Sequence, residues 1–301
     1  MVTAAADESV AETLAKAAHE NFPVAPGFLP RAWRDDLMAV YGYARLVDDI
    51  GDGDLPPGGS DAVLLGVAPE RQDDRTALLD ALAADLDRAF ADSGPGPGHP
   101  LVRGLVPTIR RAGLTPDPFR ALLEANRVDQ RVRRYETQAQ LLDYCELSAN
   151  PVGRLVLAIT GTATPERLRQ SDAICTGLQL VEHLQDVAED LARGRIYLPA
   201  TAMRRFRVTE KDLARPTANA SVRTLVAYQT DRARRLLDEG APLVGGVHGR
   251  LRLLLAGFLG GGYAAAHAIA QARYDVLAGP PRASRGRLLY AAATALRQRG
   301  T

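Results

Sequence analysis

The hydrophobic positions of this chain repeat with the spacing of α-helices over almost its whole length. Apolar residues recur every three or four positions, and no stretch alternates strictly enough to indicate a half-buried strand. The pattern therefore predicts an all-α protein. Its helices are expected over residues 8–20, 30–50, 73–92, 100–112, 117–130, 138–160, 165–192, 218–238, 249–277 and 284–298.

Helix ends carry the residue types expected there. Asp117-Pro118 and Thr164-Pro165 each place a capping residue and a proline at a predicted start, and Gly113 follows a predicted end. No internal repeat or low-complexity tract divides the chain. We predict a single domain over residues 1–301, with helices packed around a central cavity.

Two segments depart from the amphipathic pattern. Residues 51–70 are rich in glycine, proline and aspartate, which predicts a mobile surface loop, either a cover for a bound ligand or a tolerated insertion. Leu253 to Ala272 lacks charged residues and is long enough to span a membrane. Its glycines, His267 and Gln271 favour a buried central helix instead.

Composition excludes several classes of protein. With 46% hydrophobic residues the chain can build a substantial core. A net charge of +1 provides no strong positive electrostatic field that would attract nucleic acid. Cys145 and Cys175 lack the spacing of metal ligands, and the N-terminus lacks a secretory signal. We expect a reduced, cytoplasmic protein.

Two acidic clusters suggest the chemistry. Asp48 and Asp52, and likewise Asp186 and Asp190, are four residues apart, which places each pair on one face of a helix. Most acidic pairs are solvated surface, but both clusters follow apolar runs, where carboxylates are costly without a partner. Carboxylate oxygens suit Mg²⁺, which leaves ligand positions for phosphate. We predict two clusters that hold a diphosphate through Mg²⁺.

Longer motifs resemble a known family, the squalene and phytoene synthases, over about residues 17–290. Within it, the chain is most similar to the hydroxysqualene synthases of bacterial hopanoid biosynthesis. The motifs are Glu20-Asn21-Phe22-Pro23-Val24, Arg45 to Asp52, Leu142-Asp143-Tyr144-Cys145, Ser148-Ala149-Asn150-Pro151-Val152-Gly153-Arg154, and Gln185 to Asp190 followed by Gly194-Arg195-Ile196-Tyr197-Leu198-Pro199.

The resemblance implies an isoprenoid-synthase-type helical bundle and roles for individual residues. The metal ligands would be Asp48, Asp49, Asp52, Asp186, Glu189 and Asp190. The substrate would be bound by Asn21, Phe22, Arg45, Asn150, Gln179, Arg273, Tyr274, Arg282 and Arg285. A carbocation would be stabilised by aromatic faces, for which the candidates are Phe22, Tyr41, Tyr43, Tyr144 and Phe258, with Tyr41 and Tyr144 assigned to catalysis.

One position departs from the family. Glu182 stands where asparagine is usual, four residues before Asp186. Glu182 either turns outward or binds Mg²⁺ in place of the amide, and the substitution leaves the substrate and product open. The neighbouring His183 is expected at the surface or behind the ligands.

The resemblance implies Mg²⁺-dependent ionisation of presqualene diphosphate, rearrangement of the carbocation, and capture by water to give hydroxysqualene and pyrophosphate. Alternatives are presqualene diphosphate or squalene formation from farnesyl diphosphate, another terpene product, or a non-catalytic helical partner. The substrate predicts transient membrane contact, at the periphery of the membrane and beside other isoprenoid enzymes, although the sequence shows no evident amphipathic anchor.

Overall fold

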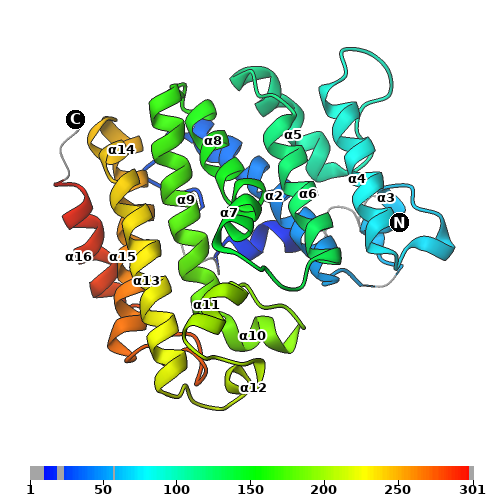
Figure 1. The fold of residues 1–301 in the computed structure, drawn as a ribbon. Helices are drawn as coiled ribbons and strands as arrows, with labels where there is room; N and C mark the ends of the chain where they lie inside the picture. The colour runs from blue at the N-terminus through cyan, green and yellow to red at the C-terminus, as the bar shows by residue number, and fades with distance from the viewer. Residues whose placement is uncertain (1–9, 19–23, 57, 298–301) are drawn as a thin grey trace. The chain divides into compact units, whose positions relative to one another are not determined.

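The computed structural model describes residues 10–18, 24–56 and 58–297. Its regular elements in these ranges are all helices, which confirms the predicted all-α class (Figure 1). They are a helical segment over residues 10–15, which leads into η1 (Lys16–Ala18), and then α2 (Arg31–Asp52), α3 (Ser60–Leu64), η2 (Pro69–Arg71), α4 (Arg75–Phe90), α5 (Pro100–Ala112), α6 (Asp117–Arg131), α7 (Gln138–Ser148), α8 (Asn150–Ile159), α9 (Pro165–Gln185), α10 (Val187–Ala192), α11 (Ala200–Arg205), α12 (Glu210–Leu213), α13 (Ala220–Gly240), α14 (Pro242–Gly245), α15 (Gly249–Gln271) and α16 (Arg285–Ala295).

The chain divides into two compact units. Unit 1 comprises Met1–Arg131 and Arg154–Ala163, and unit 2 comprises Val132–Gly153 and Thr164–Thr301. The first acidic cluster lies in unit 1 and the second in unit 2. The expectation of one domain around a central cavity stays a prediction.

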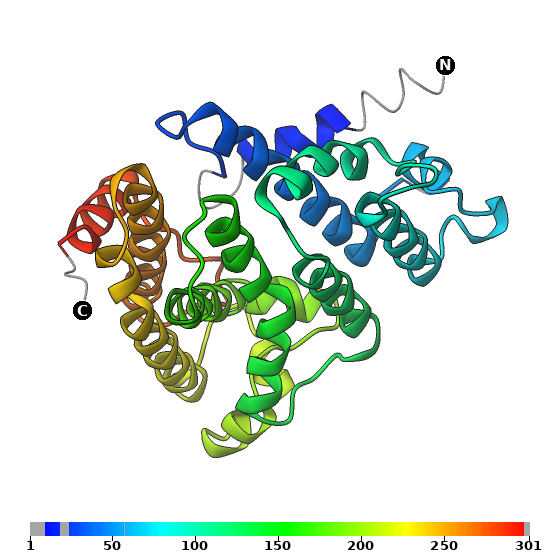
Figure 2. The ribbon, with the colours of Figure 1, turned by 90° about the horizontal axis from the view of Figure 1, so that it is seen from above.

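Unit 1 is organised around α2, which packs against α4, α5 and α6 (Figure 2). Tyr43, Leu46, Val47 and Ile50 of α2 are almost completely buried, and they recur at helical spacing. The Tyr43 hydroxyl donates a hydrogen bond of 3.2 Å to the Phe119 carbonyl. Tyr43 is therefore a core residue, and its prediction as part of a carbocation-stabilising wall is wrong.

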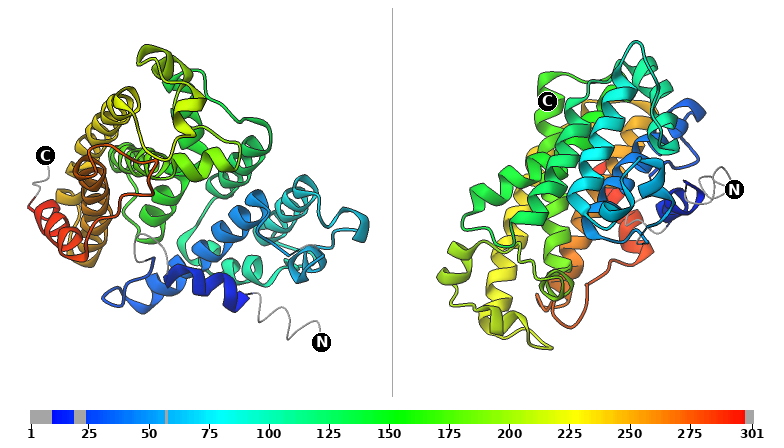
Figure 3. Two further views of the ribbon diagram at one scale, coloured as in Figure 1. Left: turned by 90° about the horizontal axis from the view of Figure 1, so that it is seen from below. Right: turned by 90° about the vertical axis from the view of Figure 1, so that its right-hand side faces the viewer.

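Unit 2 is built on long helices in mutual contact. α9 packs against α13 and α15, and α15 also packs against α13 and α16 (Figure 3). Among the described residues, α15 is the one helix long and apolar enough to cross a membrane. Since 61% of its most apolar window is buried inside the protein, α15 has the environment of a core helix, as the sequence favoured.

Two predicted helices are interrupted. The helix expected over 138–160 is α7 and α8, which meet at Ala149, and the helix expected over 165–192 is α9 and α10. The second break falls on Asp186, whose backbone angles are φ −101° and ψ 12°. The short helices α3, α11, α12 and α14 were not predicted, because four to six residues are too few to show a helical period.

Candidate active site

The C-terminal turn of α2 presents the first acidic cluster. Asp48 is exposed and Asp52 is partly exposed, one helical turn apart. The helix then stops at Gly53, whose φ of 75° lies in the left-handed region, and the Gly53 N–H bonds back to the carbonyls of Asp49 and Ile50. The local sequence thus ends α2 directly after the two carboxylates.

Asp49 has a different environment from its neighbours. Its side chain is 1% exposed, and its two oxygens accept hydrogen bonds from Lys16 Nζ at 2.7 Å and Arg45 Nε at 2.8 Å. A buried carboxylate with two cationic partners already has its charge compensated. This arrangement does not support the prediction that Asp49 is a metal ligand; it makes Asp49 the residue that holds Arg45.

Asn126 on α6 contacts the first acidic cluster, and the sequence motifs did not reveal it. Its Nδ2 donates a hydrogen bond of 3.1 Å to Oδ1 of Asp48. The two helices approach closely because residue 51 is glycine: a Cβ at Gly51 would lie 1.8 Å from Asn126 Oδ1. Gln130 Nε2, one turn further along α6, donates to the Gly51 carbonyl at 2.8 Å.

The surrounding protein raises the pKa of Asp48 to about 7, because it removes water from the carboxylate. The hydrogen bond from Asn126 and the charge of Arg45 oppose this rise, whereas the like charges of Asp52 and Asp49 add to it. The accessible surface of Asp48 keeps some water at the carboxylate and moderates the rise. A cation bound beside Asp48 and Asp52 would relieve this electrostatic cost.

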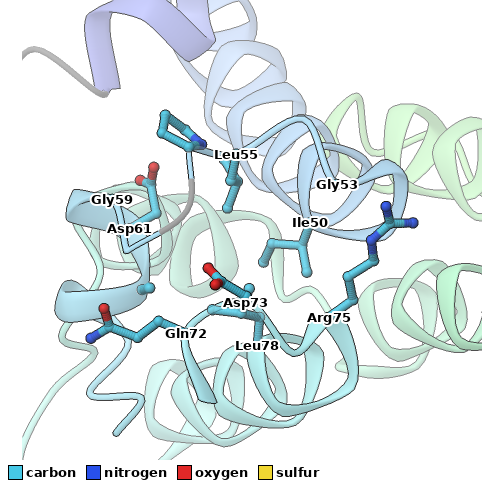
Figure 4. Close-up of a pocket in the computed structure, with 11 residues that line it drawn as sticks. Ile50, Gly53, Leu55, Gly59, Asp61, Gln72, Asp73, Arg75 and Leu78 are labelled. Atoms are coloured by element: carbon cyan, nitrogen blue, oxygen red, sulfur yellow. The ribbon is translucent and has the colours of Figure 1, made fainter. Parts of the chain in front are cut away.

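A cavity of about 140 Å³ lies beside the end of α2 (Figure 4). Arg75, on its wall, donates a hydrogen bond of 3.2 Å to the Gly51 carbonyl. Asp61 of α3 also lines it and pairs with the buried His99 through a contact of 3.0 Å to His99 Nε2. The segment expected as a loop over 51–70 is thus partly helical and anchored to the core; its mobility stays a prediction.

The second acidic cluster, in unit 2, is not on a continuous helix. Because α9 ends at Gln185 and α10 begins at Val187, the continuous helix expected over 165–192 is wrong at this point. Backbone hydrogen bonds still join Asp186 N–H to the Glu182 carbonyl at 3.0 Å and Asp190 N–H to the Asp186 carbonyl at 2.8 Å. Asp186 and Asp190 are partly exposed. Glu189 is exposed and pairs with Arg193 at 3.2 Å. Glu182 is exposed too, and whether it binds a metal stays a prediction.

The C-terminal segment reaches the second cluster. Gln185 donates a hydrogen bond to the Pro281 carbonyl. The pKa of Asp186 is raised by desolvation and by the charge of Glu189, and it is lowered by Arg282 and Arg193. Arg282 is thus close enough to Asp186 to influence its ionisation. A residue that contacts a diphosphate at this cluster would have to lie similarly close. Arg285 is exposed at the first turn of α16.

Arg273 and Tyr274 follow α15 in a left-handed backbone conformation, with φ values of 53° and 60°. The Arg273 carbonyl accepts a hydrogen bond of 2.8 Å from Arg223, which also pairs with Asp275. These contacts fix the turn in which both predicted substrate residues lie.

Aromatic residues of unit 2 form a cluster around His183. The His183 ring stacks on Tyr197 with centroids 3.8 Å apart, and Tyr144 lies 5.6 Å from Tyr197 and 6.2 Å from His183. Tyr135 stacks on Tyr197 from 5.6 Å. Desolvation, followed by the charge of Arg195, lowers the pKa of His183 to about 3, so the ring is neutral. His183 is therefore half-buried in an aromatic environment instead of lying at the surface.

The remaining predicted site residues differ in how deeply they are buried and in their hydrogen-bond partners. Asn150 is buried, and its Oδ1 accepts a hydrogen bond of 2.9 Å from Thr176. Gln179 Nε2 lies 3.4 Å from His183 Nε2, while Tyr41 and Phe258 are partly exposed. Asn21 and Phe22 lie outside the described residues.

Within the described ranges, no three histidine, cysteine or acidic side chains gather as a ready-made metal site. Mg²⁺ does not require such a group, since it commonly takes one or two protein carboxylates together with water and substrate phosphates. The accessible, mutually repelling Asp48 and Asp52 fit that mode of binding.

Comparison with known proteins identifies the family. The sequence model of the squalene/phytoene synthases matches residues 15–288. The chain belongs to the squalene/phytoene synthase family. This squalene/phytoene synthase family member is 32% identical to a hydroxysqualene synthase of Zymomonas mobilis, over 76% of this chain and 71% of that protein.

Other members show the range of the family. The chain is 30% identical to a 15-cis-phytoene synthase of Synechococcus elongatus, over 70% of this chain and 67% of that protein. The crystal structure of squalene synthase HpnC from Alicyclobacillus acidocaldarius is 40% identical, with a TM-score of 0.75 over 91% of this chain and 94% of that one. The predicted family and squalene-synthase-type fold are confirmed.

Proposed function

We propose that this family member ionises presqualene diphosphate and lets water capture the rearranged carbocation, which gives hydroxysqualene and pyrophosphate. The observation that carries the proposal is the end of α2, where Asp48 and Asp52 are accessible one turn apart and Arg45 is held beside them by Asp49. The similarity to a hydroxysqualene synthase of Zymomonas mobilis supports the product.

The residues of unit 1 would bind the leaving group. Arg45 would donate hydrogen bonds to phosphate oxygens, and its ion pair with Asp49 limits the directions in which the guanidinium can point. Asp48 and Asp52 would hold Mg²⁺, which when bound would neutralise charge on the departing diphosphate. Asn126 fixes one oxygen of Asp48, so that this carboxylate has a defined orientation.

In unit 2, Asp186 and Asp190 would be further Mg²⁺ ligands, and Arg282 would contact the diphosphate close to Asp186. In the cluster of Tyr144, Tyr197 and His183, the two tyrosines are each 8% exposed and His183 is half-buried. The accessible part of these neutral rings would stabilise a cation without reacting with it. A neutral His183 adds no positive charge that would oppose the carbocation.

The reaction balances without a redox partner. The carbon–oxygen bond to the diphosphate breaks and its electron pair leaves with pyrophosphate. The cyclopropylcarbinyl cation rearranges, a water oxygen forms the new carbon–oxygen bond, and that water loses a proton. No NADPH is consumed.

The test is incubation of the purified protein with presqualene diphosphate, Mg²⁺ and ¹⁸O-labelled water, without a reductant. We expect pyrophosphate and a C30 alcohol that carries the label, and we expect EDTA to abolish both. Release of pyrophosphate with an unlabelled or hydrocarbon product would reject water capture. Absence of pyrophosphate would reject the ionisation itself.

A second candidate function is condensation of farnesyl diphosphate, supported by the similarity to a presqualene diphosphate synthase of Rhodopseudomonas palustris and by the exposed Glu182 at a position where asparagine is usual. Farnesyl diphosphate supplied alone, followed by mass spectrometry of the products, separates the two. A C30 product or presqualene diphosphate from this substrate would favour condensation, and an unreacted substrate would favour the first proposal.

A further inference from the structure

The last described helix, α16, uses one side to pack on α15 (Figures 1 and 3). The contact is close because residue 260 of α15 is glycine: a Cβ there would lie 2.5 Å from the backbone nitrogen of Ala292. Arg252 of α15 donates a hydrogen bond of 2.7 Å to the carbonyl of Leu296, just after α16. This side of α16 is therefore fixed to the core of unit 2.

The opposite side of α16 carries exposed apolar side chains. Leu289 is 73% exposed and Tyr290 is 65% exposed, the highest values among the large hydrophobic residues that the structure describes. Helical spacing places Arg285 and Ala293 on the same side, and the turn directly after α16 adds Arg297; all three are exposed. We call Arg285, Leu289, Tyr290, Ala293 and Arg297 the outer face of α16. Adjacent large apolar side chains exposed in this way are typical of an interaction surface.

The charge around the outer face has one sign. From Val276 to Arg297 the chain contains no aspartate or glutamate, whereas it contains Arg282, Arg285, Arg287 and Arg297. The whole protein has a net charge of only +1, so the positive charge is concentrated here. The guanidinium of Arg287 lies 5.7 Å from the ring centroid of Tyr290, which places positive charge beside an exposed aromatic ring.

Arginine, leucine and tyrosine on one exposed helical face match the interfacial layer of an anionic membrane. The apolar side chains can enter the acyl boundary, tyrosine prefers the headgroup level, and arginines attract phosphate groups. A second copy of this chain fits less well. Two outer faces related by a two-fold axis would bring like charges together, which disfavours such a contact.

We propose that the outer face of α16 docks on an anionic membrane surface, with Leu289 and Tyr290 entering the interface. Two apolar side chains and a few arginines provide reversible attachment, in contrast to a membrane-spanning anchor. Docking of this kind would keep the protein at the layer from which a prenyl substrate must be drawn. It goes beyond the proposed reaction and does not depend on it.

The test is flotation of the full-length protein with vesicles of two compositions. Phosphatidylcholine vesicles should bind little protein, whereas vesicles with equal parts phosphatidylcholine and phosphatidylglycerol should bind it and release it at high salt. The double variant L289S/Y290S should lower the partition coefficient for the anionic vesicles by about tenfold or more, because two inserted apolar side chains are lost. Arg297→Glu should lower it several-fold through charge alone.

The matched control is Val63→Ser, which removes another exposed apolar side chain, 52% accessible, in unit 1. This variant should bind anionic vesicles as the parent protein does. Each variant should unfold at the parent temperature, since the changed side chains are exposed.

Three outcomes would overturn the proposal. They are failure of the parent protein to bind anionic vesicles, equal binding of the parent and L289S/Y290S to those vesicles, or equal binding of the parent to phosphatidylcholine and anionic vesicles. Pyrophosphate release from detergent-dispersed substrate should be unaffected in L289S/Y290S. Turnover therefore reports on the proposed function separately, and vesicle binding reports on docking.

Discussion

The Nδ2 of Asn126 lies 3.1 Å from Oδ1 of Asp48, in a hydrogen bond between residues 78 positions apart in the chain. The contact joins α6 to the carboxylate cluster of α2. It depends on Gly51, since any side chain there would occupy the space of the Asn126 amide. Three residues from two helices thus form one unit that orients Asp48.

Asn126→Leu should weaken Mg²⁺ binding. The substitution removes a hydrogen bond to a charged carboxylate, and the amide also opposes the rise in the pKa of Asp48, so both effects disfavour the ionised, oriented form. We expect the Mg²⁺ concentration for half-maximal pyrophosphate release to rise by about tenfold, the equivalent of about 1.4 kcal/mol. Mn²⁺ binding followed by electron paramagnetic resonance should weaken in parallel.

Gln130→Leu is the matched control, because Gln130 lies on the same helix and its side-chain amide donates hydrogen bonds to the backbone carbonyls of Gly51 and Asn126. It should lower stability while leaving the Mg²⁺ dependence unchanged. An unchanged Mg²⁺ dependence in Asn126→Leu would remove Asn126 from any role at the cluster.

Gly51→Ala should act through the same contact. The added Cβ would meet the Asn126 side chain at 1.8 Å and force it to rotate away from Asp48. Overpacking of this kind costs about 1–3 kcal/mol of stability. In a double-mutant cycle with Asn126→Leu, the effects on Mg²⁺ dependence should be strongly non-additive, because each substitution breaks one shared hydrogen bond. Additive effects would show that Gly51 and Asn126 act independently.

Asp49→Asn and Asp48→Asn should have opposite consequences. Asp49 balances the positive charges of Arg45 and Lys16 in a buried position. Replacing it with asparagine should lower the free energy of unfolding, measured by urea denaturation, by about 1–3 kcal/mol. Asp48→Asn should leave stability nearly unchanged, as Asp48 is exposed. It should lower pyrophosphate release on the order of 100-fold, as loss of a group that stabilises transition-state charge does. A stable but inactive Asp49→Asn would instead make Asp49 a metal ligand.

The stability of the protein should depend on pH through His183. Its folded pKa of about 3 lies below the ordinary value of 6.5, so between these values the unfolded chain binds more protons than the folded chain. The stabilisation that comes from the neutral His183 ring is fully present above pH 6.5 and is lost as the pH falls below that value. The free energy of unfolding should change with pH by less than the one-proton limit of about 1.4 kcal/mol per pH unit, because the His183 ring is only half-buried.

His183→Phe keeps an aromatic ring beside Tyr197 but has no proton to bind. In urea denaturation at a series of pH values from 7 to about 5, its stability should change less steeply than that of the parent protein. Parallel pH profiles would show that His183 is charged in the folded protein or equally solvated in both states.

Much of the local structure was open to prediction from the chain. The helices α2, α4, α5, α6 and α13 match predicted ranges closely, because each buries a regularly spaced apolar stripe. The breaks at Ala149 and Asp186 were not predictable from periodicity, since apolar residues continue on both sides of each. The outer face of α16 was missed for a related reason: exposure of Leu289 depends on which side packs on α15.

The sequence by itself determined the family, the all-α class and the spacing of Asp48 and Asp52, because a helix fixes the relation of residues four apart. Only the tertiary structure decided that Asp49 is buried against Arg45 and Lys16 while the adjacent Asp48 is exposed. Neighbouring residues on a helix point in directions about 100° apart, so identical side chains one position apart meet different surroundings. Packing between helices then assigns one carboxylate to the core and leaves the other accessible for a ligand.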